Sequence, residues 1–242
     1  MVASLGNVRN RREEGCFVAE GTKCVIDTWN SFKCKYLFAT TAWIEQHEKE
    51  LPNAQPIVAK RADMERMSQL STPTQVLAVY EMPQVTFDEK GLSSNLVIAL
   101  DRVQDPGNLG TIIRIADWFG ITDIVCSPET VDVYNPKVVQ ATMGAISRVK
   151  VHYLDLAELI KRNPDIPVYG TFLDGRNIYE TSLTPHGIVV MGNEGQGISD
   201  EIGRLIKRRL FIPSFPQSRP TSESLNVGMA TAITVAEFRR RI

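Results

Sequence analysis

Three short stretches in the C-terminal half of the chain combine glycines with polar side chains that could do chemistry. The first spans residues 105–116, where a Pro-Gly turn leads to Asn108, a residue type that favours the N-cap of a helix. A turn that opens a helix presents backbone N–H groups to a ligand. Within that helix Arg114 lies between two isoleucines. Its guanidinium either extends past a core edge into solvent or points into a site, and the sequence leaves both open.

The second stretch, residues 191–199, places three glycines within six residues and includes Glu194. It follows an apolar run at 188–191, and loops at the carboxyl ends of parallel strands are where open α/β sheets bind ligands. The spacing matches neither a phosphate-binding GxxxxGK[ST] loop nor a dinucleotide-binding GxGxxG turn. A plain strand-to-helix turn is the alternative interpretation of this loop.

The third stretch joins an Ile-Pro pair at 212–213 to a Ser-Leu-Asn-Val run at 224–227, just before the last helical pattern. Ser224 or Asn226 could cap that helix, because both residue types accept hydrogen bonds from the first free N–H groups of a helix. Taken alone, this stretch fits capping and a role in a site equally well.

Alternating strand-like and helical patterns predict an α/β protein in two blocks. Residues 1–81 are expected to form a small three-layer α/β domain, residues 82–94 a linker, and residues 95–242 a second domain. The continuous apolar run Leu96–Leu100 suits a parallel strand covered on both faces. Further strands are predicted at 36–39, 56–59, 75–80, 121–126, 149–153, 168–173, 188–191 and 210–212, and an amphipathic helix at 227–240.

The composition limits the class of protein. The chain has 242 residues, of which 43% are apolar and 23% charged, and its net charge of −1 argues against disorder and against a strongly basic nucleic-acid binder. The four cysteines and three histidines lack the spacing of a zinc site, so we expect no metal and free thiols in the cytoplasm. No apolar run approaches the roughly 18 residues of a membrane span. Basic clusters at 9–12, 207–209 and 239–241 are either solvated surface or phosphate-contacting patches.

The three stretches, taken in order, resemble a known set of motifs. The patterns NxGxxxR at 108–114, MGNEGxG at 191–197 and IP…SLNV at 212–227 are similar to the three signature motifs of the SpoU family of RNA ribose 2′-O-methyltransferases, in the TrmH-like branch of the SPOUT superfamily. The resemblance spans residues 96–241. REEGCFVAEG at 12–21 and LSTPTQ at 70–75 resemble the opening and closing patterns of the small L30e-like α/β substrate-binding domain of many ribosomal-RNA members.

The resemblance implies a deep trefoil knot at the C-terminal end, S-adenosylmethionine (SAM) bound in the knotted loops, and a homodimer with active sites near the subunit interface. It implies that Arg114 activates a ribose 2′-hydroxyl, either by polarising it or by pinning a neighbouring phosphate, because a guanidinium is not a normal base. By the same resemblance, ribose and arginine are positioned by Asn108, Glu194, Ser224 and Asn226. The expected cofactor contacts are Gly192, Ile212 and Leu225, with Met191 and Thr171 in addition.

Two features depart from the family pattern. Segment 214–223 is longer than expected, which leaves its cofactor contacts open, and Arg219 within it either reaches RNA or is solvated. Gly228 stands where serine is common, a change expected to alter helix packing and not chemistry. Ribosomal RNA is the expected substrate and tRNA the alternative, because tRNA-acting relatives often lack such an N-terminal block. A non-catalytic RNA-binding assembly factor and a base-methylating knotted enzyme are the other hypotheses.

Overall fold

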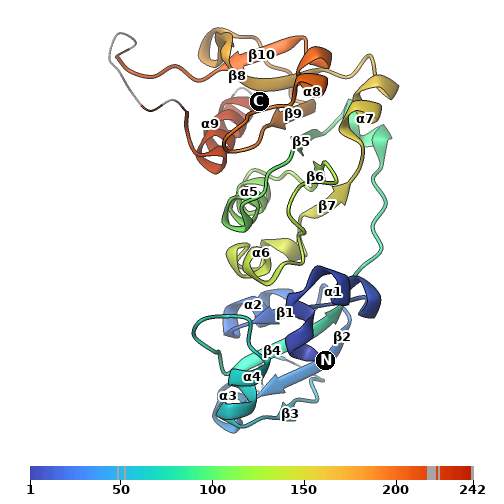
Figure 1. The fold of residues 1–242 in the computed structure, drawn as a ribbon, viewed down its shortest axis with the longest axis vertical. Coiled ribbons are helices and arrows are strands. Elements are labelled where there is room, and N and C mark those ends of the chain that lie inside the picture. The colour runs from blue at the N-terminus through green and yellow to red at the C-terminus, as the bar shows by residue number, and fades with distance from the viewer. Residues whose placement is uncertain (48, 52, 217–221, 223, 241–242) are drawn as a thin grey trace. The chain divides into compact units, whose positions relative to one another are not determined.

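The chain divides into two compact units, whose elements are labelled in Figure 1. The computed structural model describes residues 1–47, 49–51, 53–216, 222 and 224–240. Unit 1 comprises Met1–Gln84 and Asp132–Ser147, and unit 2 comprises Val85–Val131 and Arg148–Ile242. Segment 132–147 therefore belongs by its contacts to unit 1, although unit 2 surrounds it in the sequence. The division into functional domains at 1–81 and 95–242, with a linker at 82–94, stays a prediction.

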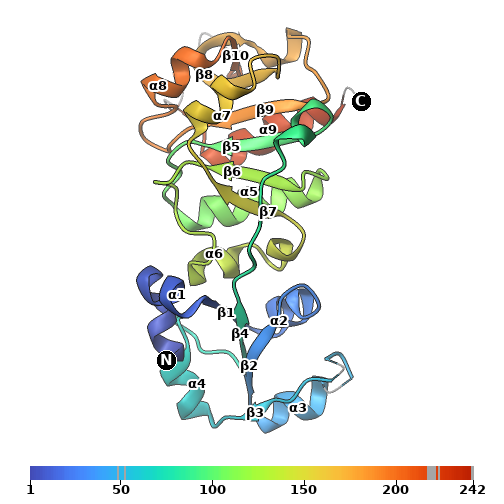
Figure 2. The same ribbon diagram turned by 90° about the vertical axis from the view of Figure 1, so that its right-hand side faces the viewer.

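Unit 1 is built on a four-stranded sheet with the strand order β1-β4-β2-β3. Alternate residues of its strands point to opposite faces, so Val18 and Val79 join one apolar cluster while Phe17 and Tyr80 stack on the other face. Figure 2 shows α1 and α4 on one side of this sheet and α2 and α3 on the other, the three layers predicted. The elements are η1 (Val2–Gly6), α1 (Val8–Glu14), β1 (Cys16–Glu20), α2 (Thr22–Thr28), β2 (Cys34–Ala39), α3 (Thr41–His47), β3 (Ile57–Val58), α4 (Arg61–Met67), β4 (Val76–Glu81), α6 (Pro136–Ala141) and η3 (Ala145–Ser147).

One arginine of the basic cluster at 9–12 lies inside unit 1. Arg11 is only 1% exposed, and its guanidinium donates to the Asp132 carboxylate. It also donates to the carbonyl oxygens of Leu5 and Gly6, at 2.8 and 2.9 Å. Both sequence interpretations of this residue, solvated surface and phosphate contact, are therefore wrong. A buried cation stays charged only where such partners replace water.

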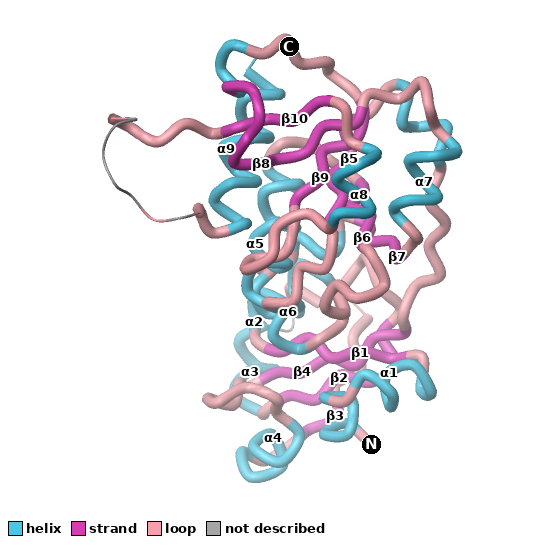
Figure 3. Tube along the Cα trace, turned by 45° about the horizontal axis from the view of Figure 1, so that its top comes forward, coloured by secondary structure: helices cyan, strands magenta, loops and turns pink. Residues whose placement is uncertain are grey.

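Unit 2 is a six-stranded parallel sheet with the strand order β10-β8-β9-β5-β6-β7. Figure 3 shows α5 and α9 on one side of the sheet and α7 and α8 on the other, so both faces of the central strands are covered. The elements are η2 (Glu89–Ser93), β5 (Leu96–Leu100), α5 (Pro106–Trp118), β6 (Asp123–Cys126), β7 (Lys150–Tyr153), α7 (Leu156–Arg162), β8 (Val168–Asn177), η4 (Ile178–Glu180), β9 (Gly187–Met191), α8 (Asp200–Leu205), β10 (Arg208–Phe211) and α9 (Val227–Arg240).

The pairing of β8 with β10 is interrupted. Arg209 of β10 pairs with Gly170, but the next residue, Leu210, pairs with Arg176. Residues 171–175 of β8, the skipped segment, therefore pair with no residue of β10. Gly175 is required here, because a Cβ at this position would collide with the backbone of Leu210. The skipped segment is free to shape the surface at this end of the sheet.

Candidate functional site

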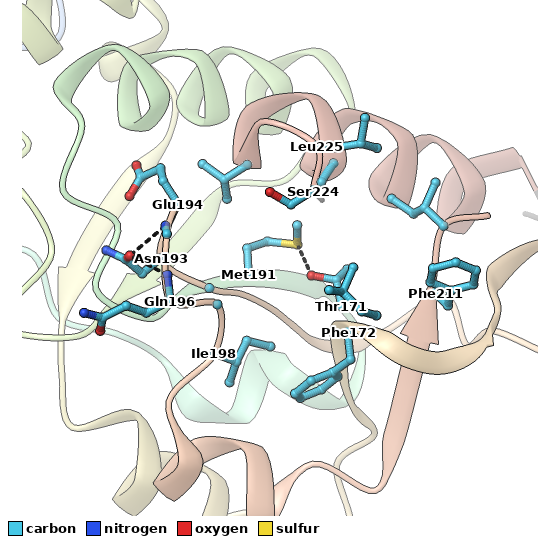
Figure 4. A pocket seen from close by; sticks show the side chains of 17 residues that line it. Thr171, Phe172, Met191, Asn193, Glu194, Gln196, Ile198, Phe211, Ser224 and Leu225 are labelled. Carbon is cyan, nitrogen blue, oxygen red and sulfur yellow. Dashed lines mark hydrogen bonds between the residues drawn. The ribbon is translucent and has the colours of Figure 1, made fainter. Parts of the chain in front are cut away.

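The second and third stretches meet at one pocket of unit 2, with a volume of about 440 Å³ (Figure 4). That volume lies within the range of small-molecule sites. The pocket is formed by the skipped segment of β8, the glycine loop after β9, the end of β10 and the start of α9. All five predicted cofactor contacts line it, together with two predicted ribose-positioning residues: Thr171, Met191, Gly192, Ile212, Leu225, Glu194 and Ser224.

The glycine loop after β9 is held in a tight, closed form. Its two ends pair through backbone hydrogen bonds between Asn193 and Gly197. The Asn193 side chain accepts from two N–H groups inside the loop and donates to the carbonyl of Arg102 at 2.8 Å. A Cβ at Gly192 would collide with the backbone of Gly197 and Ile198, so only glycine permits this close approach. The loop is therefore a shaped wall of the pocket and more than a plain turn.

A chain of side-chain hydrogen bonds links all three motif stretches. The Asn226 amide donates to Asn108 Oδ1 at 2.9 Å, and the Asn108 amide donates to Glu194 Oε1 at 2.9 Å. Because Glu194 also lines the pocket, this network lies at the pocket's edge. We call Asn108, Glu194 and Asn226, named in sequence order, the Asn–Glu–Asn network; Asn108 is the residue bonded to both of the others.

The position of Asn108 differs from the sequence prediction. The N-cap of α5 is Asp105, whose carboxylate accepts the Asn108 N–H at 2.8 Å, and Pro106 opens the helix. Asp at the N-cap with Pro at the next position is a strongly favoured helix start. Asn108 lies one turn inside the helix, so its amide is free to bond to other elements. The expectation that Asn108 would be the cap was therefore wrong.

Glu194 is held as a carboxylate. Partial burial alone would raise its pKa, but hydrogen bonds from the Asn108 amide and from the backbone N–H groups of Asp105 and Gln104 outweigh burial, and the pKa lies below its ordinary value. Both carboxylate oxygens accept hydrogen bonds. Glu194 is thereby suited to positioning its neighbours and poorly suited to taking up a proton.

Asn226 combines the two roles that the sequence left open. Its Oδ1 accepts from the N–H groups of Gly228 and Met229 at the start of α9, while its amide belongs to the Asn–Glu–Asn network. Ser224 lines the pocket, two residues before it. Capping and a role in the site are therefore compatible in one residue.

Arg114 stands apart from the other predicted site residues. It is exposed on the surface of α5 and does not line the pocket. Of the basic cluster at 239–241, Arg239 donates to the Phe119 carbonyl and Arg240 pairs with Glu237. Residues 217–221 and 223, including Arg219, lie outside the described residues.

Sequence reasoning missed several residues of the site. The buried Asp101 follows β5 and accepts the Ser199 N–H at 2.6 Å, a hydrogen bond that anchors the end of the glycine loop. Asp101 also forms an ion pair with Arg102. An aspartate directly after an apolar strand was the available signal. Phe172 and Phe211 also line the pocket, but the register shift that brings them there leaves no mark in the sequence pattern.

No group of three or more potential metal ligands occurs among the residues that the structure describes. Within the same part of the chain, no helix combines the length and apolarity needed to span a membrane.

Known proteins are similar to this chain in sequence and in fold. The model of the SpoU rRNA methylase family matches residues 95–236, and that of the MRM3-like substrate-binding domain matches residues 1–78. The chain is 33% identical to the 23S rRNA (guanosine(2553)-2′-O)-methyltransferase RlmP of Bacillus subtilis over 72% of this chain and 68% of that protein.

Solved structures that cover the whole chain include the following two. A putative RNA methyltransferase of the TrmH family from Porphyromonas gingivalis is 38% identical, with a TM-score of 0.86 over 100% of this chain and 96% of its own. An AdoMet-bound rRNA methyltransferase from Sinorhizobium meliloti is 28% identical, with a TM-score of 0.85 over 100% and 93%. The predicted fold class, a knotted SPOUT domain after a small α/β substrate-binding domain, is confirmed. The chain belongs to the SpoU rRNA methylase family.

Proposed function

We propose that this protein transfers a methyl group from SAM to a ribose 2′-hydroxyl of ribosomal RNA. The observation that carries the proposal is the Asn–Glu–Asn network, which joins all three motif stretches at the edge of the pocket lined by the predicted cofactor contacts. Relatives named as 23S rRNA 2′-O-methyltransferases in Bacillus subtilis and Streptomyces viridochromogenes support the reaction and the substrate.

The pocket fits SAM by its chemistry. Apolar side chains such as Ile198, Phe211 and Leu225 suit an adenine ring, and the glycine loop brings backbone groups close enough to bond to polar atoms. When bound, SAM supplies a methyl group on a positively charged sulfonium. The protein then has to place the 2′-hydroxyl in line with that methyl group and help its proton to leave.

The protein's own residues divide this work. Asn108 and Asn226 place amide groups beside the pocket, and the ionised Glu194 fixes Asn108 in one orientation. Since a guanidinium does not accept a proton, we assign Arg114 to polarising the hydroxyl or holding the adjacent phosphate.

We further propose that the protein is a homodimer whose site is completed at the subunit interface. Helices α5 and α9 pack against each other and expose Trp118 by 85% and Met229 by 63%. A partner chain that covered α5 and α9 would remove these two large apolar side chains from water. A second copy covering this surface would bring the exposed Arg114 of α5 to an interface. Location in the cytoplasm stays a prediction.

The test is methyl transfer by the purified full chain. Deuterated methyl-SAM is incubated with unmodified ribosomal RNA or tRNA, and the digested nucleosides are analysed by mass spectrometry. We expect labelled 2′-O-methylnucleosides from ribosomal RNA. Label on a base, or none in either RNA although calorimetry shows SAM binding, would contradict the reaction; label only in tRNA would contradict the substrate.

A further inference from the structure

A second, strongly basic pocket lies between β8 and β10. Its volume is about 330 Å³. Four basic side chains line it against a single carboxylate, that of Asp174. The full lining is Asp174, Gly175, Arg176, Thr181, Lys207, Arg208, Arg209 and Leu210. Such an excess of positive charge in a concave surface favours an anion.

The two pockets are neighbours along the same two strands. Phe172 and Phe211 line the pocket assigned to SAM, while Asp174 and Leu210, one or two residues away, line the basic pocket. The register shift between Arg209 and Leu210 produces both, because the skipped residues 171–175 contribute to each lining.

Two of the four cations are fixed by aromatic rings. The Arg208 guanidinium donates to the Tyr169 hydroxyl at 2.6 Å and lies 5.1 Å from the centre of that ring. The Arg209 guanidinium lies 3.5 Å from the centre of the Phe172 ring and pairs with Asp174. Their positions are thereby set before any ligand binds.

The other two cations, Arg176 and Lys207, are exposed, and neither has an ion-pair partner among the described residues. Asp174 is already engaged by Arg209. Positive charge therefore remains uncompensated on Arg176, Lys207 and Arg208. An arginine fork beside an ammonium group is suited to phosphate oxygens.

We propose that this basic pocket binds a backbone phosphate of the substrate RNA, next to the nucleotide being methylated. The inference rests on the proposed RNA activity and adds a site to it. A phosphate contact of this kind sets the register of the strand and carries no sequence information. It accounts for the basic cluster at 207–209, which would otherwise be solvated surface.

The test is RNA binding by the double variant Arg176→Gln/Lys207→Gln of the full chain. The probe is a fluorescent single-stranded RNA of mixed sequence, titrated by anisotropy over a series of KCl concentrations. We expect the Kd for RNA to rise about tenfold and the salt dependence, log K against log[KCl], to become shallower by about 1. SAM affinity should not change, because neither residue lines the SAM pocket.

The matched control is Lys90→Gln/Lys150→Gln, which removes the same charge from exposed positions of unit 2 outside both pockets. A third variant, Asp174→Asn, removes the only carboxylate of the basic pocket and should tighten RNA binding. Equal losses in the two double variants would overturn the proposal, as would an unchanged Kd.

Inorganic phosphate, followed by ³¹P line broadening, is the second probe. Phosphate binding that the Arg176→Gln/Lys207→Gln variant loses while RNA affinity stays constant would identify a small-anion site instead and overturn the RNA assignment. Failure of the proposed function is distinguished by the unmodified protein, which would then bind RNA without methylating it.

Discussion

Arg11 in unit 1 and Glu194 in unit 2 are both charged groups to which the protein supplies several hydrogen-bond partners. Arg11 donates to Asp132 and to two backbone carbonyls, and it is enclosed. Glu194 accepts from Asn108 and from two backbone N–H groups, yet it lines an open pocket. The same kind of bonding serves the stability of a fold in one place and the shape of a site in the other.

Arg114 completes this comparison by contrast. It carries the same guanidinium group as Arg11, but it is exposed on α5 and has no ion-pair partner among the described residues. A charge that the protein has already neutralised has little left for a substrate, whereas an exposed guanidinium keeps its donors for a phosphate or hydroxyl. Substitutions at these positions should therefore act on different quantities.

The largest effect is expected for Arg114→Ala. If Arg114 acts on the ribose hydroxyl or its phosphate, the rate of methyl transfer at saturating SAM should fall about 10³-fold, the loss typical of removing one charge-stabilising or proton-handling group. SAM affinity, measured by calorimetry, should stay the same because Arg114 does not line the pocket. Arg204→Ala, on the exposed surface of α8, is the control and should keep the full rate. Normal turnover by Arg114→Ala would show that the assigned role is wrong.

Arg11→Met should act on stability instead. It leaves the Asp132 carboxylate and the carbonyls of Leu5 and Gly6 without their donor, so the free energy of unfolding should fall by about 3 kcal/mol. Arg9→Met is the matched control: Arg9 is exposed and pairs with Glu13, and such pairs contribute under about 1 kcal/mol. Urea unfolding of both variants measures the difference. Equal losses would remove the distinction between the enclosed and the exposed arginine.

Gly192→Ala should act on the cofactor. The added methyl group would meet the backbone of Gly197 and Ile198, so the glycine loop must move away from its present position. We expect SAM affinity to fall by about 10- to 100-fold, which corresponds to about 1.4 to 2.7 kcal/mol. Gly203→Ala on α8 is the control, because a Cβ there makes only ordinary contact with Phe172. Unchanged SAM affinity in Gly192→Ala would mean that the loop does not shape the cofactor site.

Local patterns predicted much of the fold. The strand Leu96–Leu100 and the C-terminal helix Val227–Arg240 have the predicted bounds, and the other predicted strands differ mainly at their ends. Runs of apolar residues and helical periodicity depend on near neighbours, which the sequence displays. Seven of the ten predicted site residues line one pocket, Asn108 and Asn226 are linked to it through hydrogen bonds that lead to Glu194, and Arg114 lies outside it; their roles stay predictions.

Features that depend on distant partners could not be predicted in this way. Arg11 is buried because Asp132, 121 positions later, reaches it through segment 132–147, which joins unit 1. The position of Asn108, by contrast, was mispredicted although the signal is local, because Asp105 followed by Pro106 is the stronger helix start. The register shift of β8 and β10, which brings Phe172 to the pocket, depends on how the two strands meet in space.

The smallest effect, a change in pH dependence, is expected for Glu194→Gln. The hydrogen bonds that outweigh burial hold the pKa of Glu194 below the ordinary value of 4.5. A lowered pKa in the folded state contributes stability that is fully present above the unfolded value and is lost as the pH falls through the folded value. The wild-type protein should therefore lose stability below about pH 4.5, and the uncharged glutamine should make this decline shallower. Urea unfolding at a series of acidic pH values measures how steeply the free energy of unfolding falls with pH in each protein.

The control is Asp155→Asn, which removes a carboxylate from the cap of α7, outside the pocket. Its slope gives the effect of losing a carboxylate elsewhere in unit 2. If Glu194→Gln merely matches that slope, the Asn–Glu–Asn network does not depend on the charge of Glu194.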